Sequence, residues 1–461
     1  MLLTSITSIL FISYFLPVFL LLYYAAPGGT RGKNLILLGA SLLFYAWGEM
    51  QYLGVLAISI VANYAFGFLV TPKSGRKQPV ALWCGIGLNL LLLVIYKYSK
   101  FVVGISVDNL QLLLPLGISF FTFKAISYLV DVSRGEIEVE HSLLNFGSYL
   151  AMFPQVVAGP IMRYSSAGPE LKARSHSAPL FLQGAESFIV GLSQKMLIAS
   201  SVAHATDSIF KLAPANLSAS LAWLGAIAYT IQIYFDFAGY TNMAIGMGRM
   251  LGFHFPPNFR YPYASQSITD FWQRWHITLS TWFRDYLWFP LGANRHGKWR
   301  TYGNLVIVFA LCGIWHGANY TFLVWGMFHG AVLVVERAGL LRWLSRLPRP
   351  LRTGYAILVI MIGWVIFRSD TISYALNYLS VMFGFGGDNV SQTVWRYLTL
   401  DVVLALGAGI LFSFPWNSQT DGSFVQMRRS AVRWPVLIVL LALSVMVVAE
   451  GSHNAFLYFR F

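Results

Sequence analysis

Stretches with few or no charged residues recur along the whole chain, and they restrict it to one class of fold. Only 11% of its 461 residues are Asp, Glu, Lys or Arg, whereas soluble domains carry about 25%. The charge-poor runs are approximately 5–25, 34–48, 51–70, 79–96, 109–130, 143–162, 178–210, 212–235, 237–253, 301–335, 353–367, 397–413 and 435–449. Because a helix needs about 20 apolar residues to cross a bilayer, they predict an all-α polytopic integral membrane protein with about 10–12 transmembrane helices. Some of the shorter runs are expected to form interfacial or re-entrant helices.

The chain has a net charge of +14, and its basic residues gather in the connections between the apolar runs. That placement is typical of loops beside anionic lipid headgroups, so we expect a lipid bilayer around the chain and no nucleic-acid partner. No Lys or Arg precedes the first run, whereas Arg31 and Lys33 follow it. We therefore expect a retained first helix, with the N-terminus outside and the 26–33 loop in the cytoplasm.

We expect one transmembrane domain over 1–461, with N-terminal helices in 1–100, a motif-bearing core in 109–340 and C-terminal helices in 353–461. The longest polar connections are 163–178, 254–300, 341–352 and 414–433, and none resembles a soluble domain. Pro348 and Pro350 prevent 341–352 from forming one regular helix. The two cysteines, Cys84 and Cys312, lie in apolar runs and give neither a disulfide framework nor a zinc site.

Residues 266–290 form a segment rich in Trp, Arg, Asp and His, and we expect an amphipathic helix at the membrane interface. Ser267 or Thr269 is suited to cap its start, and Asp270 lies four residues before Arg274, a favourable acid-then-base spacing. An apolar stripe is expected from residues at i, i+4, i+7 and i+11: Phe271, Trp275, Thr278 and Trp282. Arg274, Arg284 and Asp285 lie off this stripe, and Pro290 and Gly292 end the segment.

His316 is the first candidate for chemistry, because it lies in a run with no Asp, Glu, Lys or Arg between Arg300 and Glu336. An imidazole in apolar surroundings indicates a functional site, and neutral histidine is well suited to take a proton from an alcohol. The alternative is a buried histidine whose polar atoms are satisfied by a backbone carbonyl or by Asn319. The run is too long for one crossing, and we expect it to bend at the residues that permit a turn, Gly313, Gly317 and Asn319.

His276 and Asp236 are further candidates. His276 lies two residues after Arg274 on the expected amphipathic helix, where many histidines have no role. Asp236 lies in an otherwise apolar passage, so it must be paired or neutral. It either orients a histidine, as a carboxylate does in hydrolase triads, or holds Arg274 or Arg284 in a structural ion pair.

Other polar residues in the apolar part of the chain give weaker signals. Cys312 is more simply a small apolar residue than the carrier of an acyl thioester, and His329 is expected to have a supporting or packing role. The residues expected to line the substrate path or support the two histidines are Tyr234, Asp236, Arg274, Arg284, Asp285, Trp315 and Asn319. No spacing of His, Cys or acidic residues indicates a metal site, and no phosphate-binding glycine loop or Gly-x-Ser-x-Gly motif occurs.

Several passages closely resemble the membrane-bound O-acyltransferase family, within it the bacterial branch typified by the membrane subunit of alginate O-acetylation. They are PLGISFFTFKAISYLVDVSRGE (115–136), FPQVVAGPIMRY (153–164), YFDFAGYTNMAIGMGRMLGF (234–253), PYASQSITDFWQRWHITLSTWFRDYLWFPLGANR (262–295), GIWHGANYTFLVWGMFHG (313–330) and AFLYFRF (455–461). The resemblance covers nearly the whole chain. Its core motifs show no departure, so differences are confined to loops and length.

This resemblance implies helices ringed around a tunnel, in which a cytosolic acyl donor meets an acceptor from the other side of the membrane. The family's essential histidine maps onto His316 and its second histidine onto His276. The implied reaction is O-acetyl transfer from acetyl-CoA towards an exported polysaccharide such as alginate or cellulose, with no bound cofactor. Periplasmic acetyltransferases are the implied partners, and the implied location is the bacterial inner membrane.

Two other functions remain open. One is transfer of D-alanine to teichoic acid, a reaction of the same family. The other is a transporter or channel for acyl groups or polysaccharide that makes no bond. An inverted-repeat transporter shows two matching halves, and the 254–300 segment has no counterpart in the N-terminal half. A channel would tolerate a polar residue of similar size in place of His316, whereas a transferase would not.

Overall fold

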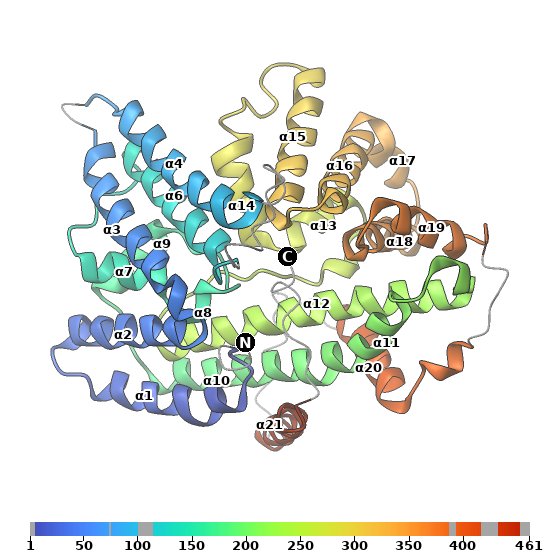
Figure 1. The fold of residues 1–461 in the computed structure, drawn as a ribbon, viewed down its shortest axis with the longest axis horizontal. Coiled ribbons are helices and arrows are strands. Elements are labelled where there is room, and N and C mark those ends of the chain that lie inside the picture. The colour runs from blue at the N-terminus through green and yellow to red at the C-terminus, as the bar shows by residue number, and fades with distance from the viewer. Residues whose placement is uncertain (1–4, 73–74, 100–113, 387–392, 416–431, 452–461) are drawn as a thin grey trace. The chain divides into compact units, whose positions relative to one another are not determined.

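The computed structural model describes residues 5–72, 75–99, 114–386, 393–415 and 432–451, and every regular element in these ranges is helical (Figure 1). The chain forms two compact units. Unit 1 consists of Met1–Ile189 and Tyr240–Pro256, and unit 2 consists of Val190–Gly239 and Pro257–Phe461. The expected all-α class is confirmed. The expectation of one transmembrane domain over 1–461 stays a prediction.

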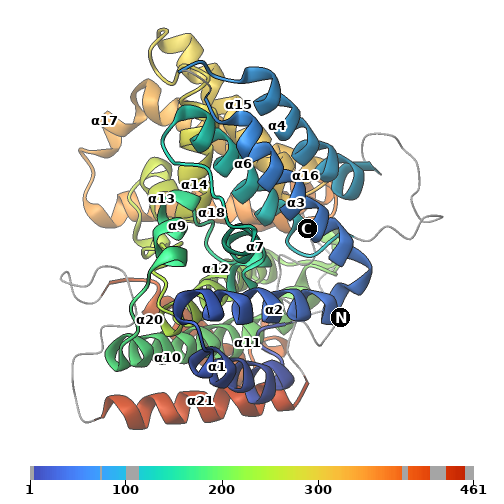
Figure 2. The same cartoon turned by 90° about the vertical axis from the view of Figure 1, so that its left-hand side faces the viewer.

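Unit 1 begins with a hairpin of α1 (Leu16–Ala25) and α2 (Gly29–Glu49), which run side by side in both views (Figures 1 and 2). Gly28 and Gly29 have φ of 77° and 64°, left-handed values that glycine adopts without strain, so the connection is tight. The other helices described in this unit are α3 (Leu53–Val70), α4 (Pro79–Leu93), α6 (Ile118–Arg134), α7 (Leu143–Ala151), α8 (Phe153–Val156), α9 (Tyr164–Lys172), most of α10 (Ala178–Ser193) and the last part of α12 (Ala219–Met250). Short segments η1 (Phe11–Phe15), η2 (Met50–Tyr52) and η3 (Val94–Tyr98) extend them.

Unit 2 contains most of the long helix α12 (Ala219–Met250) and the segments that follow it. The other helices in the described part of this unit are α11 (Ser200–Ile209), α13 (Ile268–Arg274), α14 (Ile277–Phe283), α15 (Lys298–His316), α16 (Tyr320–Val335), α17 (Leu341–Leu344), α18 (Arg349–Arg368), α19 (Ile372–Met382), α20 (Leu400–Phe412) and α21 (Arg433–Ala449). Shorter segments are η5 (Gln194–Ala199), η6 (Pro214–Asn216), η7 (Pro262–Ala264), η8 (Arg284–Trp288), η9 (Glu336–Leu340) and η10 (Val394–Arg396). As expected, 341–352 is not one helix, because α17 ends at Leu344 and α18 begins at Arg349.

Six helical stretches in the described part of the chain are long and apolar enough to cross a bilayer. They are Gly29–Val70, Pro79–Tyr98, Ala178–Ile209, Ala219–Met250, Tyr320–Leu344 and Arg349–Arg368. Shorter apolar helices are Phe11–Ala25, Leu400–Phe412 and Arg433–Ala449. The polytopic fold is therefore confirmed, whereas the number of 10–12 crossings, the tunnel and the orientation of the N-terminus stay predictions.

Asp236 separates two charge-poor runs of the sequence but does not interrupt the structure. The runs 212–235 and 237–253 both contribute to α12, which continues through Asp236 for 32 residues in all. A charged residue in the middle of a buried helix requires a partner. That partner comes from η5 (Gln194–Ala199), the segment that precedes α11.

Candidate active site

His316 is the last residue of α15, and the packing of α15 against α16 fixes its position. Two glycines lie where the helices touch: a Cβ added at Gly313 would stand 2.2 Å from the Phe322 carbonyl oxygen, and one at Gly326 would stand 2.2 Å from the Phe309 carbonyl oxygen. Small residues of this kind allow helix backbones to approach closely in membranes. The contact holds the end of α15, and with it His316, against the start of α16.

The expected bend between the two helices is confirmed at Gly317 and Asn319. Gly317 is extended and ends α15, and the Asn319 side chain caps α16 by accepting a hydrogen bond from the Thr321 backbone N–H at 3.1 Å. The Asn319 amide nitrogen donates to the Asp370 carbonyl oxygen at 3.0 Å. Asn319 thus shapes the turn after His316, and both ends of its amide are engaged there. Gly313 provides close packing rather than a bend.

The segment 266–290 starts as expected. Ser267 caps α13 by accepting a hydrogen bond from the Asp270 backbone N–H at 3.0 Å. Arg274 Nε donates to Asp270 Oδ1 at 2.7 Å, so the expected acid–base pair is present. Both features follow from local spacing alone.

The expectation of one continuous interfacial helix over 266–290 is wrong. Helix α13 ends at Arg274, and His276 adopts a left-handed conformation, with φ of 43° and ψ of 53°, before α14 begins. Such a conformation costs a non-glycine residue about 1 kcal/mol or more. The stripe expected to lie against the membrane surface, Phe271, Trp275, Thr278 and Trp282, is instead buried within unit 2.

Asn258 explains why the helix breaks. Its carbonyl oxygen accepts a hydrogen bond from the Ile277 backbone N–H at 3.0 Å. Its side-chain oxygen accepts one from the Thr278 hydroxyl at 2.6 Å and one from the Thr278 backbone N–H at 3.2 Å. These bonds satisfy donors at the start of α14 that a continuous helix would have satisfied internally. Asn258 is distant in sequence from His276, so local patterns gave no signal for it.

The break brings His276 and His316 to the same indole. The ring centroids of His276 and Trp315 are 6.2 Å apart, and those of Trp315 and His316 are 4.9 Å apart. His276 is fully buried, and only 5% of His316 is exposed. The two histidines that the sequence proposed are therefore neighbours of one tryptophan, although 39 positions separate His276 from Trp315 in the chain.

Further aromatic rings surround the two histidines, and together with Trp315 they form an aromatic wall around the candidate site. His276 packs edge-on against Phe237 at 4.7 Å, and His316 contacts Trp325 at 5.0 Å and Phe367 at 5.3 Å. Burial lowers the pKa of His276 to about 3, so its imidazole is neutral near pH 7. A neutral imidazole in this position is suited to hydrogen bonding with a reacting group rather than to holding a positive charge.

Asp236 forms its ion pair with Lys195, which was not among the residues predicted from the sequence. Both side chains are buried, and Lys195 lies in η5. Lys195 is the single Lys or Arg between positions 178 and 210, and this isolation was the signal that could have identified it. Arg274 and Arg284, the partners expected from sequence, instead pair with Asp270 and Asp285, in each case with a closest approach of 2.7 Å.

The other candidates divide into two groups. Tyr234 is buried in an aromatic cluster that supports the His276 segment, with its ring 5.2 Å from that of Tyr263 and 6.2 Å from that of Trp275. The side chains of Arg274 and Arg284 are 36% and 56% exposed, whereas that of Asp285 is 16% exposed. The structure therefore gathers Trp315 and the two histidines, and it places Tyr234 against Trp275, the residue before His276. The arginine pairs lie outside that cluster.

Two further residues support the site. Glu336 is fully buried and accepts hydrogen bonds from the backbone N–H groups of Ile268 and Thr269 at 2.6 and 2.9 Å, so its carboxylate holds the start of α13. His329 contacts Trp325 with a centroid separation of 5.2 Å, and Trp325 also contacts His316. His329 thus lies behind the ring that His316 touches, because the bend redirects α16.

An apolar cavity of about 290 Å³ lies beside this wall within unit 2. Its lining residues are Thr269, Trp272, Gln273, Leu279, Ser280, Phe283, Arg284, Trp288, Leu305, Val308, Phe309, Cys312 and Leu333. Cys312 is thus a buried lining residue, one turn before His316 on α15.

Comparison with known proteins decides the family. Residues 89–372 match the model of the membrane-bound O-acyltransferase family. The chain belongs to the membrane-bound O-acyltransferase family. It is 38% identical to a probable alginate O-acetylase, AlgI, of Azotobacter vinelandii, over 99% of both chains. It is 32% identical to a peptidoglycan O-acetyltransferase of Helicobacter pylori, over 98% of this chain and 96% of that one.

Similarity to a teichoic acid D-alanyltransferase of Bacillus subtilis is more limited, at 30% identity over 47% of this chain and 58% of that one. Membership in this family, together with the apolar helices, makes the chain a multi-pass membrane acyltransferase. The cluster around Trp315 lies within the matched residues, as do His276 and His316.

Proposed function

We propose that this membrane-bound O-acyltransferase moves an acetyl group from acetyl-CoA towards hydroxyl groups of an exported polysaccharide. Alginate and cellulose both fit the acceptor chemistry, and the implied location is the bacterial inner membrane. The relatives named as alginate O-acetylase and peptidoglycan O-acetyltransferase support transfer of acetyl to a glycan. The final acceptor is either the glycan itself or a periplasmic acetyltransferase that passes the group on.

One observation carries the assignment of the site: His276 and His316 both contact Trp315. His276 lies in the break between α13 and α14, whereas His316 is the last residue of α15, and the backbone around each is tightly constrained. His276 requires a left-handed backbone, and the end of α15 at His316 requires glycines in close helix contact. Backbone strain of the kind seen at His276 is concentrated at functional sites.

The reaction then follows from the two imidazoles. A nitrogen of His316 takes the proton of the acceptor hydroxyl as its oxygen attacks the thioester carbonyl carbon. The new C–O bond forms, the C–S bond breaks, and the proton passes from His316 to the departing CoA thiolate. His276, neutral because it is buried, donates its N–H towards the carbonyl oxygen as negative charge develops there. The aromatic wall excludes water, which strengthens this hydrogen bond.

The test is the acetyl content of exported polysaccharide in cells that produce wild-type protein or His316→Ala at matched membrane levels. His204→Ala is the control, because His204 is an exposed histidine of α11 in the same unit. The proposal is supported if His316→Ala removes acetyl groups from the glycan, His204→Ala does not, and export of the glycan continues in both. Unchanged acetyl content would show that His316 is structural.

The same cells discriminate the rival functions. A transporter that makes no bond would tolerate His316→Gln. A substitution that did inactivate such a transporter would stop export of the glycan itself. D-alanyl transfer is the second candidate, because of the similarity to the Bacillus subtilis enzyme. Labelled acetate and labelled D-alanine supplied in parallel separate the two transferases by which label reaches the glycan.

A further inference from the structure

Three basic side chains meet in unit 1 beside the turn between α1 and α2. Lys33 Nζ lies 3.3 Å from His176 Nδ1, and both groups surround Tyr23. Arg174 Nε donates to the Tyr23 hydroxyl at 2.8 Å, and the same hydroxyl lies 3.1 Å from His176 Nε2. Lys33 also lies over the ring of Tyr24, 5.4 Å from its centroid. The contacts place two formal positive charges and an imidazole around one tyrosine.

No carboxylate of the described residues lies within 4.0 Å of Lys33 or Arg174. Arg174 donates only to neutral acceptors there: the Tyr23 hydroxyl, the Asn34 side-chain oxygen and the carbonyl oxygens of Glu170 and Leu251. Its Nη2 is buried and has no hydrogen-bond partner among these residues. Two adjacent cations without a counter-ion repel each other, and an anion would relieve that repulsion.

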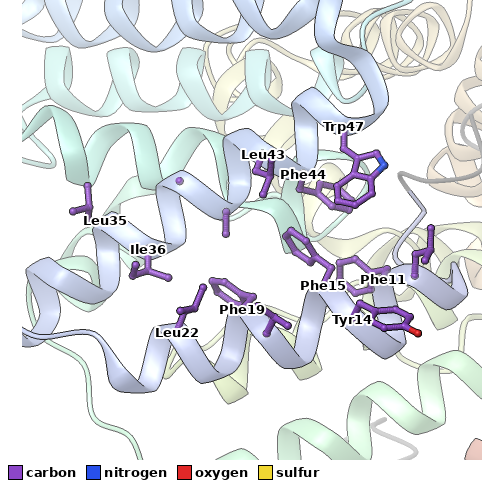
Figure 3. A pocket seen from close by; sticks show the side chains of 14 residues that line it. Phe11, Tyr14, Phe15, Phe19, Leu22, Leu35, Ile36, Leu43, Phe44 and Trp47 are labelled. Carbon is purple, nitrogen blue, oxygen red and sulfur yellow. The ribbon is translucent and has the colours of Figure 1, made fainter.

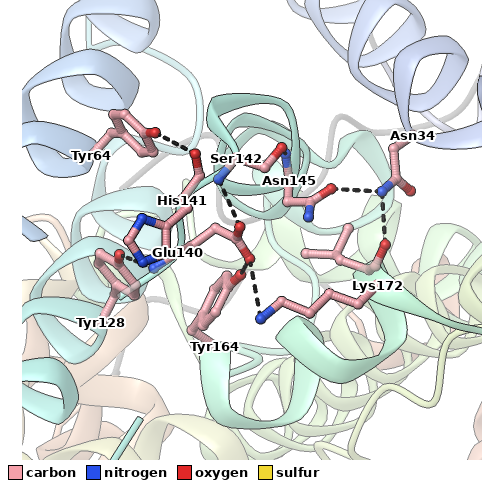
Figure 4. A network of polar contacts seen from close by, with 10 residues as sticks. Asn34, Tyr64, Tyr128, Glu140, His141, Ser142, Asn145, Tyr164 and Lys172 are labelled. Atoms are coloured by element: carbon pink, nitrogen blue, oxygen red, sulfur yellow. Dashed lines mark hydrogen bonds and ion pairs between the residues drawn. The ribbon is translucent and has the colours of Figure 1, made fainter. Parts of the chain in front are cut away.

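Acidic side chains in the same part of unit 1 have other partners. Glu140 accepts hydrogen bonds from the Ser142 backbone N–H at 2.7 Å and from the Tyr164 hydroxyl, with Lys172 Nζ at 3.9 Å (Figure 4). The Glu170 carboxylate lies 2.8 Å from His254 Nδ1. Neither is therefore available to neutralise the cluster.

Neutral groups hold the cluster in place. Asn34, which accepts from Arg174, donates to the Asn145 side-chain oxygen at 2.9 Å and to the Leu171 carbonyl oxygen at 2.8 Å (Figure 4). The cluster therefore belongs to a fixed polar network rather than to freely moving surface side chains. Burial, together with Lys33 and Arg174, lowers the pKa of His176, which is the response of an imidazole to a positive environment.

Two hollows adjoin these residues. The smaller, about 370 Å³, is lined by Tyr24, His176, Ser177, Ala178, Phe181 and Leu182. The larger, about 640 Å³, is an apolar groove along α1 and α2, lined among others by Phe15, Phe19, Leu35, Leu43 and Trp47 (Figure 3). At 1.5 Å per residue, the α2 side of the groove from Leu35 to Trp47 extends about 18 Å. This length is close to one leaflet of a hydrocarbon core of about 30 Å.

We propose that unit 1 binds an anionic phospholipid here, with its phosphate at Lys33, Arg174 and His176 and one acyl chain in the groove between α1 and α2. The headgroup supplies the negative charge that the described acidic residues do not. The acyl chain fills an apolar groove between the short apolar helix Phe11–Ala25 and the stretch Gly29–Val70, which is long and apolar enough to cross a bilayer. This site is additional to the acyltransferase chemistry, since it uses none of the residues around Trp315.

The first test measures binding of dioleoyl phosphatidylglycerol and dioleoyl phosphatidylcholine to the full-length purified protein by native mass spectrometry. Wild-type protein is expected to prefer phosphatidylglycerol. Lys33→Gln is expected to reduce that preference about fivefold, because a basic residue near an anionic lipid surface contributes about 1 kcal/mol. Lys77→Gln is the matched control, since Lys77 is an exposed lysine of the α3–α4 loop in the same unit.

The second test fills the groove. Gly39 lines it, and a Cβ at this position meets no atom within 4 Å, so Gly39→Leu places a side chain in the groove without a clash. It is expected to lower binding of either lipid about threefold or more, since about 0.8 kcal/mol is lost per displaced CH₂ group. Gly54→Leu is the control, because Gly54 lies on α3 with equally open space around it and does not line the groove.

Four results would overturn the proposal. Equal binding of the two lipids to wild-type protein, or full preference retained by Lys33→Gln, would remove the headgroup site. Lipid binding unchanged by Gly39→Leu would remove the acyl-chain groove. Displacement of phosphatidylglycerol by millimolar inorganic phosphate would assign the cluster to a soluble anion instead. Acetyl transfer is not the readout, so failure here is distinguishable from failure of the proposed enzymatic function.

Discussion

Lys195 and Asp236 form an ion pair within unit 2, with 1% and 7% of their side chains exposed. Asp236 lies one residue before Phe237, whose ring contacts His276 at 4.7 Å. The pair therefore allows α12 to carry a carboxylate at its centre while presenting the adjacent face to a candidate catalytic histidine. A buried pair is not in itself evidence of stability, but removing one member leaves a charge that the interior does not solvate.

Replacing Asp236 with Asn is expected to destabilise unit 2 by about 3 kcal/mol, because the Lys195 ammonium then loses its carboxylate. The double variant Lys195→Met with Asp236→Leu removes both charges and is expected to recover most of that loss. Thermal unfolding of the purified protein in detergent measures both effects. Equal stability of wild type and Asp236→Asn would show that the pair contributes little.

Close contact between α15 and α16 predicts that the protein loses stability when a glycine at the contact is enlarged. A Cβ at Gly313 would stand 2.2 Å from the Phe322 carbonyl oxygen, whereas a Cβ at Gly303 on the same helix meets nothing within 4 Å. Gly313→Ala is expected to destabilise the protein by about 1–3 kcal/mol through overpacking. Gly303→Ala is expected to be neutral or to stabilise it by up to about 1 kcal/mol, since Ala favours helix. If both variants unfold at the same temperature, the helices do not pack as described.

Features of the site that depend on neighbouring residues were predictable from sequence, and those that depend on distant ones were not. The Ser267 cap and the Asp270–Arg274 pair follow from spacing within one turn. The break at His276 depends on Asn258, which bonds Ile277 and Thr278 from another segment. An amphipathic pattern gives no information about a partner that replaces helical hydrogen bonds.

Two of the buried carboxylates, Asp236 and Glu336, illustrate the same limit. The sequence indicated that Asp236 needs a partner, but Lys195 lies 41 positions away on another helical segment, so spacing could not select it over Arg274 or Arg284. Glu336 marked only the end of an apolar run, yet it holds the start of α13 through the Ile268 and Thr269 backbone amides. Composition and periodicity thus predicted the all-α membrane class, whereas these tertiary partners required the structure.

Burial of His276 predicts a dependence of stability on pH. Its pKa is lowered to about 3, whereas an unfolded chain has a histidine pKa of about 6.5. The unfolded state therefore binds an extra proton between these values, so the contribution to stability is full above about pH 6.5 and is lost as the pH falls towards the folded pKa. We expect the melting temperature to fall on acidification below about pH 6.5.

His276→Asn provides the control for this pH effect, because Asn does not titrate and tolerates the left-handed backbone. Its melting temperature is expected to fall less steeply on acidification than that of the wild type. Identical pH profiles for the two proteins would mean that another group dominates the response.

The shared contact with Trp315 predicts that His276 and His316 act together in catalysis. Loss of a general base typically lowers a rate by about 10²–10⁴-fold, so His316→Gln is expected to fall in that range, with a smaller loss for His276→Gln. When two residues act as one unit, the effects of replacing them on the free energy of activation are not additive. The double variant is therefore expected to be at most a few-fold slower than His316→Gln. Initial rates of acetyl transfer are measured in membranes that contain matched levels of wild type, the two single variants or the double variant. If the fold-loss of the double variant equals the product of the two single fold-losses, the two histidines act independently.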